Sequence, residues 1–144
     1  MADPDRVLVP TLGRPREDDA LAYALETFPD ADVTLLAVVT PLDAPMSEGG
    51  VLERDEDRAD AARDRATRLL ESIDDPSATD RVRIDTASGR PGTVVPRYAT
   101  EHDVDQVVMH GHDRKSSSLM RRVLGRGVAA TVVERTDRPV TVLE

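Results

Sequence analysis

The most constraining feature of this sequence is the regular alternation of short apolar runs with segments whose apolar residues recur at helical spacing. The apolar runs cover 6–11, 33–40, 81–86, 105–109 and 139–143. The first two are almost continuously apolar, which is typical of strands buried on both faces. Strands that alternate with helices predict βαβ units and therefore a parallel sheet covered on both sides.

Four segments between these runs are predicted to be helices. In the first, Leu21, Ala24, Leu25 and Phe28 stand at the spacing of one helix face. The second helix is predicted over 59–73, the third over 89–102 and the fourth over 128–135. A proline inside a helix is tolerated only near its start, so we expect Pro96 to lie in the first turn or so of the third helix.

These elements predict one domain over residues 1–144 with a flavodoxin-like or Rossmann-like three-layer sandwich. It would contain a five-stranded parallel sheet and four helices. In open sheets of this kind, ligands bind beyond the carboxyl ends of the strands, where the strand order reverses. We therefore expect a binding site among the residues that follow Thr11, Thr40 and Met109.

The net charge of the chain disfavours one class of function, nucleic-acid binding. Asp and Glu number 28 against 19 Lys and Arg, which gives a net charge of −9, and Lys115 is the single lysine. An acidic, lysine-poor surface is typical of a halophilic protein, and it disfavours nucleic-acid binding because phosphates are repelled. With no cysteine, no long apolar run and no signal-peptide pattern, the sequence predicts a cytoplasmic protein without disulfides and without a membrane partner.

Three stretches resemble the universal stress protein family over nearly the whole chain. They are "RVLVPTLG" at 6–13, "ASGRPGTVVPRYATEHDVDQVVMHGHDR" at 87–114 and "VLGRGVAATVVERTDRPVTVL" at 123–143. Their order and spacing match the family together more specifically than any one alone. The resemblance implies an α/β sandwich that dimerises, often through its last strand, and a stress-response binding module without established catalysis. One subgroup of the family binds ATP.

The ATP-binding subgroup carries Gly-x2-Gly-x9-Gly-Ser/Thr, in which bare backbone N–H groups and a hydroxyl cradle the phosphates. Counted back from Gly125, the first two glycines would be His112 and Lys115, and the hydroxyl position holds Arg126. The family's nucleotide-contacting aspartate at the first strand is Leu12 here. The sequence therefore predicts weak ATP binding or none, with no catalytic residues.

If a nucleotide binds nevertheless, the resemblance implies where it would lie, with Arg114 as the best candidate for a new phosphate contact. The implied binding positions are Pro10, Thr11, Leu12, Val39, Met109, Gly111, Arg114, Gly125, Arg126, Gly127 and Val128. The last strand would otherwise leave an apolar sheet edge open to pairing, which gives dimerisation a physical reason. The predicted dimer interface is Pro139, Val140, Thr141, Val142 and Leu143.

A basic segment supports a second hypothesis, an ATP-binding and slowly hydrolysing protein that uses side chains in place of glycines. Against Asp113, this segment carries a local charge of +4 from Arg114, Lys115, Arg121, Arg122 and Arg126. Arginine side chains bind phosphate well, and the neighbouring serines 116–118 add hydroxyl donors. The alternative is that these arginines pair with surface carboxylates or with a partner subunit.

Two weaker patterns leave further hypotheses open. His110, His112 and Asp113 end the fourth predicted strand and are of types that ligate zinc or act as general acid and base, although a structural site needs a fourth ligand. As ordinary polar loop residues they need no function, and no metal site is predicted. The segment 125–130 matches G-x-G-x-x-A, but a dinucleotide fingerprint requires a strand directly before it.

Overall fold

The computed structural model describes residues 4–39, 55–111 and 127–143. Five strands form one sheet in the order β3-β2-β1-β4-β5. All four neighbouring pairs are parallel. The strands are β1 (Arg6–Thr11), β2 (Asp32–Val39), β3 (Val82–Ser88), β4 (Gln106–His110) and β5 (Val140–Leu143). The predicted α/β class and the five-stranded parallel sheet are therefore confirmed.

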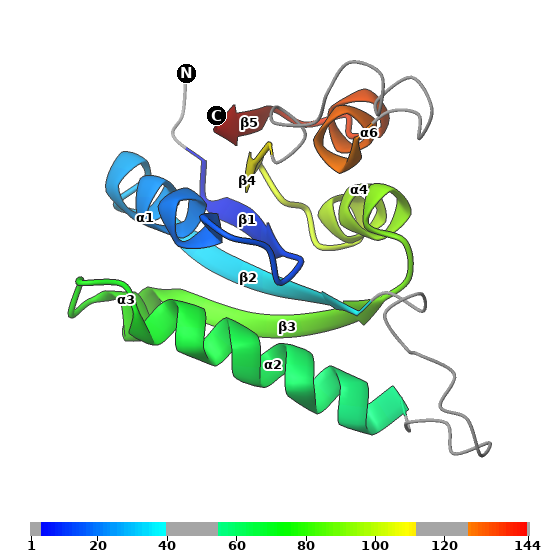
Figure 1. The fold of residues 1–144 in the computed structure, drawn as a ribbon. Helices are drawn as coiled ribbons and strands as arrows, with labels where there is room; N and C mark the ends of the chain where they lie inside the picture. Colours follow the sequence, from blue (N-terminus) through cyan, green and yellow to red (C-terminus); the bar gives the residue numbers. More distant parts are fainter. Residues whose placement is uncertain (1–3, 40–54, 112–126, 144) are drawn as a thin grey trace, which may run out of the picture.

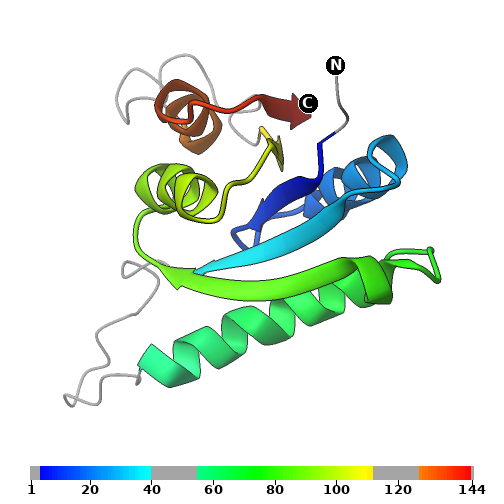
Figure 2. The same ribbon diagram turned by 180° about the vertical axis from the view of Figure 1, so that it is seen from behind.

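Helices cover both faces of this sheet (Figures 1 and 2), which makes the three predicted layers. The helices are α1 (Glu17–Thr27), α2 (Asp55–Glu71), α3 (Ala78–Arg81), α4 (Pro91–Glu101) and α6 (Val128–Arg135). In Figure 1, α2 runs along β3 on one side of the sheet, whereas α4 and α6 lie together on the other side. Of these helices, none has the length and apolar character that crossing a membrane requires.

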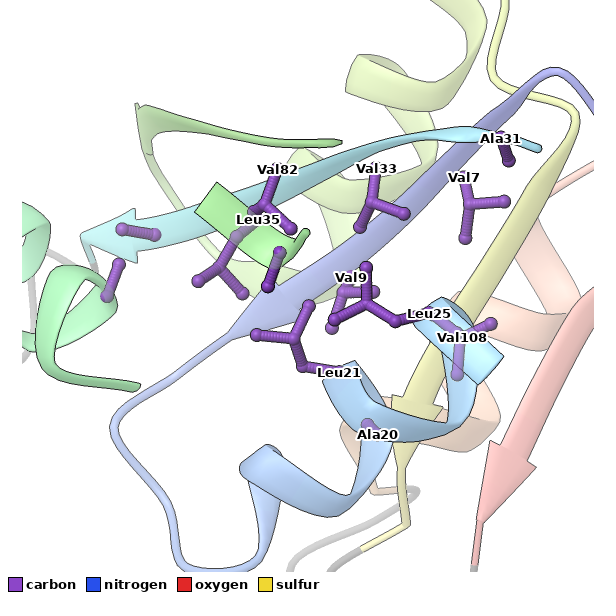
Figure 3. Packing of buried hydrophobic residues seen from close by; sticks show 14 of the residues in the cluster. Val7, Val9, Ala20, Leu21, Leu25, Ala31, Val33, Leu35, Val82 and Val108 are labelled. Atoms are coloured by element: carbon purple, nitrogen blue, oxygen red, sulfur yellow. The ribbon is translucent and has the colours of Figure 1, made fainter. Parts of the chain in front are cut away.

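The sheet separates two hydrophobic clusters. The first core cluster lies under α1 and α2 and is built by residues such as Val9, Leu21 and Leu35 (Figure 3). The second core cluster lies under α4 and α6; its buried members are Leu8, Leu36, Val38, Val94, Val95, Ala99, Val104, Val107, Met109, Ala129 and Val132. Alternate residues of each strand face opposite clusters, as the period of a strand requires.

The predicted start of the third strand and the predicted place of Pro96 in its helix are both wrong. Arg81 ends the short helix α3 and does not open β3, which begins at Val82. Pro96 lies in the middle of α4, where it removes the N–H that would bond to the carbonyl of Gly92. The helix continues because its remaining face is buried: Val95 and Ala99 are fully enclosed in the second core cluster.

A close approach of α4 and α6 depends on Gly92. A Cβ atom at this position would lie 2.7 Å from Cγ2 of Thr131, closer than side chains tolerate. The two helices therefore pack in contact at this point because position 92 has no side chain. The contact fixes the start of α6 over the carboxyl ends of the strands.

The strand order reverses between β1 and β4. Residues 6–11 of β1 all pair with β2, whereas the pairing of β1 with β4 consists of Val7 with Gln106 and Leu8 with Val107. The later residues of these two strands thus diverge toward their carboxyl ends. Open α/β sheets bind their ligands beyond the carboxyl ends of the strands, next to such a reversal of strand order.

Candidate functional site

A buried carboxylate closes the turn at the carboxyl end of β1. Glu17 is the first residue of α1 and is only 4% exposed. Its Oε1 accepts hydrogen bonds from the Thr11 hydroxyl at 2.7 Å and from the Arg14 N–H at 3.1 Å. Its Oε2 accepts one from the Leu12 N–H at 2.7 Å. The turn therefore wraps its own donors around an internal anion.

The backbone of this turn is shaped for that arrangement. Gly13 has a φ of 76° and Arg16 a φ of 68°, both in the left-handed region that brings successive N–H groups to one side. The positive end of the α1 dipole also favours a negative group at this position. From α2, the Arg65 side chain lies over the turn, with its Nε 3.3 Å from where a Cβ of Gly13 would be.

Of the predicted binding residues, three lie on the side of the sheet that the second core cluster occupies. Met109 is a buried member of this cluster, and Leu12 and Val128 pack against it. Each comes from a different element or its end, and the half-buried Leu12 and Val128 keep part of their apolar surface exposed. Val39 does not join them, because its side chain belongs to the first core cluster on the other side of the sheet.

The other predicted residues that the structure describes are either buried at a strand end or are glycines. Pro10 and Thr11 are buried at the end of β1. Gly111 follows β4 and donates its N–H to the Leu143 carbonyl at 2.8 Å, and a Cβ there would lie 2.8 Å from Cγ1 of Val142. Gly127 caps the start of α6 with an extended backbone.

Several sequence-based hypotheses fall outside the described residues. They concern Thr40, Arg114, Gly125 and Arg126, as well as the rest of the basic segment. The same holds for His112 and Asp113 of the metal hypothesis, whereas His110 is a buried residue of β4. Within the part of the chain that the structure describes, no three His, Asp or Glu residues are grouped so as to hold a metal ion.

A cavity lies at the opposite end of the sheet from the predicted site. It has a volume of about 670 Å³ and opens between the amino ends of β1, β2 and β3 and the end of α4. Two of its arginines already serve the fold. Arg6 donates to the His102 carbonyl at the end of α4, and Arg81 donates to the carbonyls of Leu25, Phe28 and Ala31 at the end of α1.

The same cavity is bordered by a small polar group on α4 and β3. The Tyr98 hydroxyl donates to Oδ2 of Asp85 at 2.7 Å, and its ring stacks on His102 with a centroid distance of 3.9 Å. Burial, followed by the hydrogen bond and negative charge of Asp85, raises the pKa of Tyr98 above its usual range. The phenol is therefore held protonated as a hydrogen-bond donor, which fixes α4 to β3.

Sequence reasoning missed Glu17, the residue that organises the β1 end. The first helix was predicted from apolar spacing, which starts at Leu21, so the first turn of α1 escaped notice. An available signal was the run of three acidic residues, 17–19, four positions after Gly13. Acidic residues concentrate in the first turn of helices because the helix dipole favours them.

Comparisons with known proteins agree with this architecture. The sequence model described as "Universal stress protein family" matches residues 4–144. A universal stress protein solved in complex with cAMP is 19% identical, with a TM-score of 0.62, and the match covers 99% of this chain and 98% of that one. UspA from Lactobacillus plantarum is 18% identical with a TM-score of 0.67, and both chains are covered at 100%.

A third structure is the universal stress protein from Archaeoglobus fulgidus in complex with dAMP. It is 14% identical, with a TM-score of 0.58, and the match covers 99% of this chain and 100% of that one. No curated protein sequence is significantly similar to this chain. The family match over nearly the whole length shows that this chain belongs to the universal stress protein family.

Proposed function

We propose that this chain is a non-catalytic, homodimeric stress-response module that binds a nucleoside monophosphate and holds ATP weakly or not at all. The observation that carries the proposal is the make-up of the diverging edge between β1 and β4. Leu12 and Val128, which are half-buried, offer apolar surface there, which suits the flat face of a base. The backbone donors at the end of β1 are already bonded to Glu17, so they are not available to a polyphosphate.

The solved relatives support the class of ligand. One universal stress protein was solved with cAMP and another with dAMP, and each of these nucleotides carries a single phosphate. Because their sequences are so different from this one, these structures do not identify the binding residues of this chain. Its affinity for a nucleotide must be measured. A family position that would add a carboxylate for the nucleotide is Leu12 in this chain.

Calorimetry with AMP, cAMP and ATP tests the proposal, at two KCl concentrations because salt screens a weak electrostatic site. We expect a monophosphate to bind at least about tenfold more tightly than ATP, a difference of about 1.4 kcal/mol. Val128→Lys should weaken this binding, since it puts a charged chain at the apolar edge. Val133→Lys is the matched control, because Val133 lies on the same helix and is 48% exposed. Equal loss in both variants would contradict the site.

The second candidate is ATP binding, with slow hydrolysis, through the basic segment. Its support is the local charge of +4 in residues 112–126 within a chain of net charge −9. Under this hypothesis Arg126→Ala abolishes ATP affinity, whereas under the main proposal there is little affinity to lose. Micromolar ATP binding that disappears in Arg126→Ala would replace the main proposal with this one.

The dimer is proposed to form through the last strand. β5 pairs with β4 on one side, and the side chains of Val140 and Val142 pack into the second core cluster. The carbonyls of Pro139 and Leu143 point to β4, so in a parallel pair the backbone of residue 142 points to the outer edge. Light scattering should give twice the chain mass of 15.7 kDa. Val142→Pro should lower it, and a monomeric wild type would refute the dimer.

A further inference from the structure

We infer that Glu17 decides which part of a ligand the β1 side of the site accepts, because its buried carboxylate occupies the hydrogen-bond donors of the turn. The position of the site rests on the proposed function above. The consequence is that the charged group of a ligand is excluded from the β1–α1 turn. Glu17 is thus a specificity-determining residue that needs no contact with the ligand.

The first step of the argument is that the carboxylate fills the turn. Its exposure is 4%, and its two oxygens together accept three hydrogen bonds of 2.7, 2.7 and 3.1 Å. The Thr11 hydroxyl, the Leu12 N–H and the Arg14 N–H are the groups that would otherwise meet an incoming phosphate or carboxylate oxygen. Charge-assisted bonds of this kind are strong, so a weakly held ligand anion does not displace them.

The second step is electrostatic. A second anion beside a buried carboxylate is repelled much more strongly than it would be in water, because the local dielectric is low. The same helix turn adds two more carboxylates, Asp18 and Asp19, which are exposed. Asp19 is paired with Arg16 at 3.2 Å, and Arg65 is the cation that lies against Gly13. Arg14 is a third arginine at this turn, so the charges balance, and the buried Glu17 carboxylate is the charge that contacts the donors. The turn therefore favours a neutral, hydrogen-bonding part of a ligand.

The third step is that removing the carboxylate should convert the turn into an anion site. In Glu17→Ala the three donors lose their acceptor, and the left-handed residues Gly13 and Arg16 still direct the N–H groups inward. A small carboxylate such as formate can then take the vacated place. Asp18→Ala is the matched control, since it removes the same charge from the same helix turn without removing any hydrogen bond to the β1 end.

The experiment compares wild type, Glu17→Ala and Asp18→Ala in formate or inorganic phosphate against KCl at constant ionic strength. We expect formate to raise the Tm of Glu17→Ala in a concentration-dependent way and to shift the amide resonances of Leu12 and Arg14. Wild type and Asp18→Ala should respond as they do to chloride. The inference is overturned if Glu17→Ala shows no more response than Asp18→Ala, or if the wild type binds formate at these amides.

The link to ligand choice is tested with ATP and adenosine. Glu17→Ala should raise the ratio of ATP to adenosine affinity at least tenfold, and Asp18→Ala should leave it unchanged. An unchanged ratio in Glu17→Ala overturns the specificity role. If wild type binds no nucleotide at all, the proposed function fails, while the formate response still decides the role of the turn.

A variant that keeps the size of the side chain guards against loss of folding. Glu17→Gln removes the charge but retains one acceptor oxygen, and Asp18→Asn is its control. If Glu17→Ala does not fold, Glu17→Gln should still raise the ATP-to-adenosine ratio, because the repulsion is gone. The same ratio in Glu17→Gln and Asp18→Asn would overturn the inference.

Discussion

At the two ends of the sheet, side chains of opposite charge form hydrogen bonds with backbone groups. At the carboxyl end of β1, the Glu17 carboxylate accepts hydrogen bonds from the backbone N–H groups of Leu12 and Arg14, in the turn that leads into α1. At the amino end, α1 and α4 finish with free carbonyls, and Arg81 and Arg6 donate to them. The sign of each side chain matches the helix dipole at its end.

The difference between the two ends lies in burial. Glu17 is almost fully enclosed, whereas the amino end stays open as a cavity of about 670 Å³ with charged walls. The arginines that line this cavity look like an anion site, but Arg6 and Arg81 are bonded to backbone carbonyls. A charged lining thus indicates a ligand site only after the partners of each charge have been assigned.

The carboxyl end should be the more sensitive of the two. Glu17→Leu replaces the carboxylate with an apolar side chain of similar size, and it leaves three donors without an acceptor. We expect a loss of about 3 kcal/mol in the free energy of unfolding, measured by denaturant titration in KCl. Asp18→Leu should lose far less, because Asp18 is exposed. A comparable loss in both would show that the buried hydrogen bonds do not dominate.

At the amino end, Arg81→Met tests the cap of α1. The variant keeps much of the apolar stem but removes donors to Leu25, Phe28 and Ala31, and we expect a loss of about 2 kcal/mol. Arg83→Met, two positions further along, is the control, because Arg83 is exposed. If Arg83→Met were equally destabilising, the cap would not be the cause.

A smaller effect is expected from Tyr98, which joins α4 to β3 beside the open cavity. Tyr98→Phe removes the hydrogen bond to Asp85 and should cost about 1 kcal/mol. Because the folded state raises the pKa of Tyr98, its contribution is complete below pH 10 and is lost as the pH rises above that value.

The pH effect can be separated from other groups by using the Tyr23→Phe variant, in which Tyr98 is the one remaining tyrosine. Its ultraviolet titration should show delayed ionisation in the folded protein and an ordinary one in denaturant. Identical titrations in the two states would contradict the raised pKa.

The smallest effect concerns Asp75, which accepts from the Ser77 hydroxyl and N–H before α3. The hydroxyl bond and then the backbone bond hold the pKa of Asp75 below its usual value of 3.8, although it is exposed. Its contribution is therefore present above about pH 4 and lost as the pH falls below that value. Acid titration of wild type against Asp75→Asn should show a slightly flatter curve for the variant, and parallel curves would refute the contribution.

The fold could be predicted from the sequence because the spacing of its apolar residues follows the pattern of burial. The run at 33–40 and the helical spacing of Leu21, Leu25 and Phe28 report directly which faces are enclosed. Boundaries were less accurate because they depend on single contacts. Arg81 has no apolar signal, and its place in α3 follows from carbonyls that are about 50 residues away in the sequence.

The site could be predicted only in part. The binding site expected at the strand ends stays a prediction; Leu12, Met109 and Val128 all lie on the side of the sheet that the second core cluster occupies. The side chain of Val39 belongs to the first core cluster, on the other side of the sheet from these three residues. Glu17 was missed because a buried carboxylate looks like any other acidic residue of a helix start until its three donors are known.

The two core clusters draw on different parts of the sequence, and this difference has a consequence for synthesis of the protein. All buried members of the first core cluster except Val108 lie between residues 7 and 82, so one side of the sheet can close before α4 has left the ribosome. The second core cluster must wait for later residues, and until then Leu8, Leu36 and Val38 stay uncovered. We expect nascent chains arrested after β3 to protect α1 from protease while these residues bind a chaperone, and an unprotected α1 would show that both sides close together.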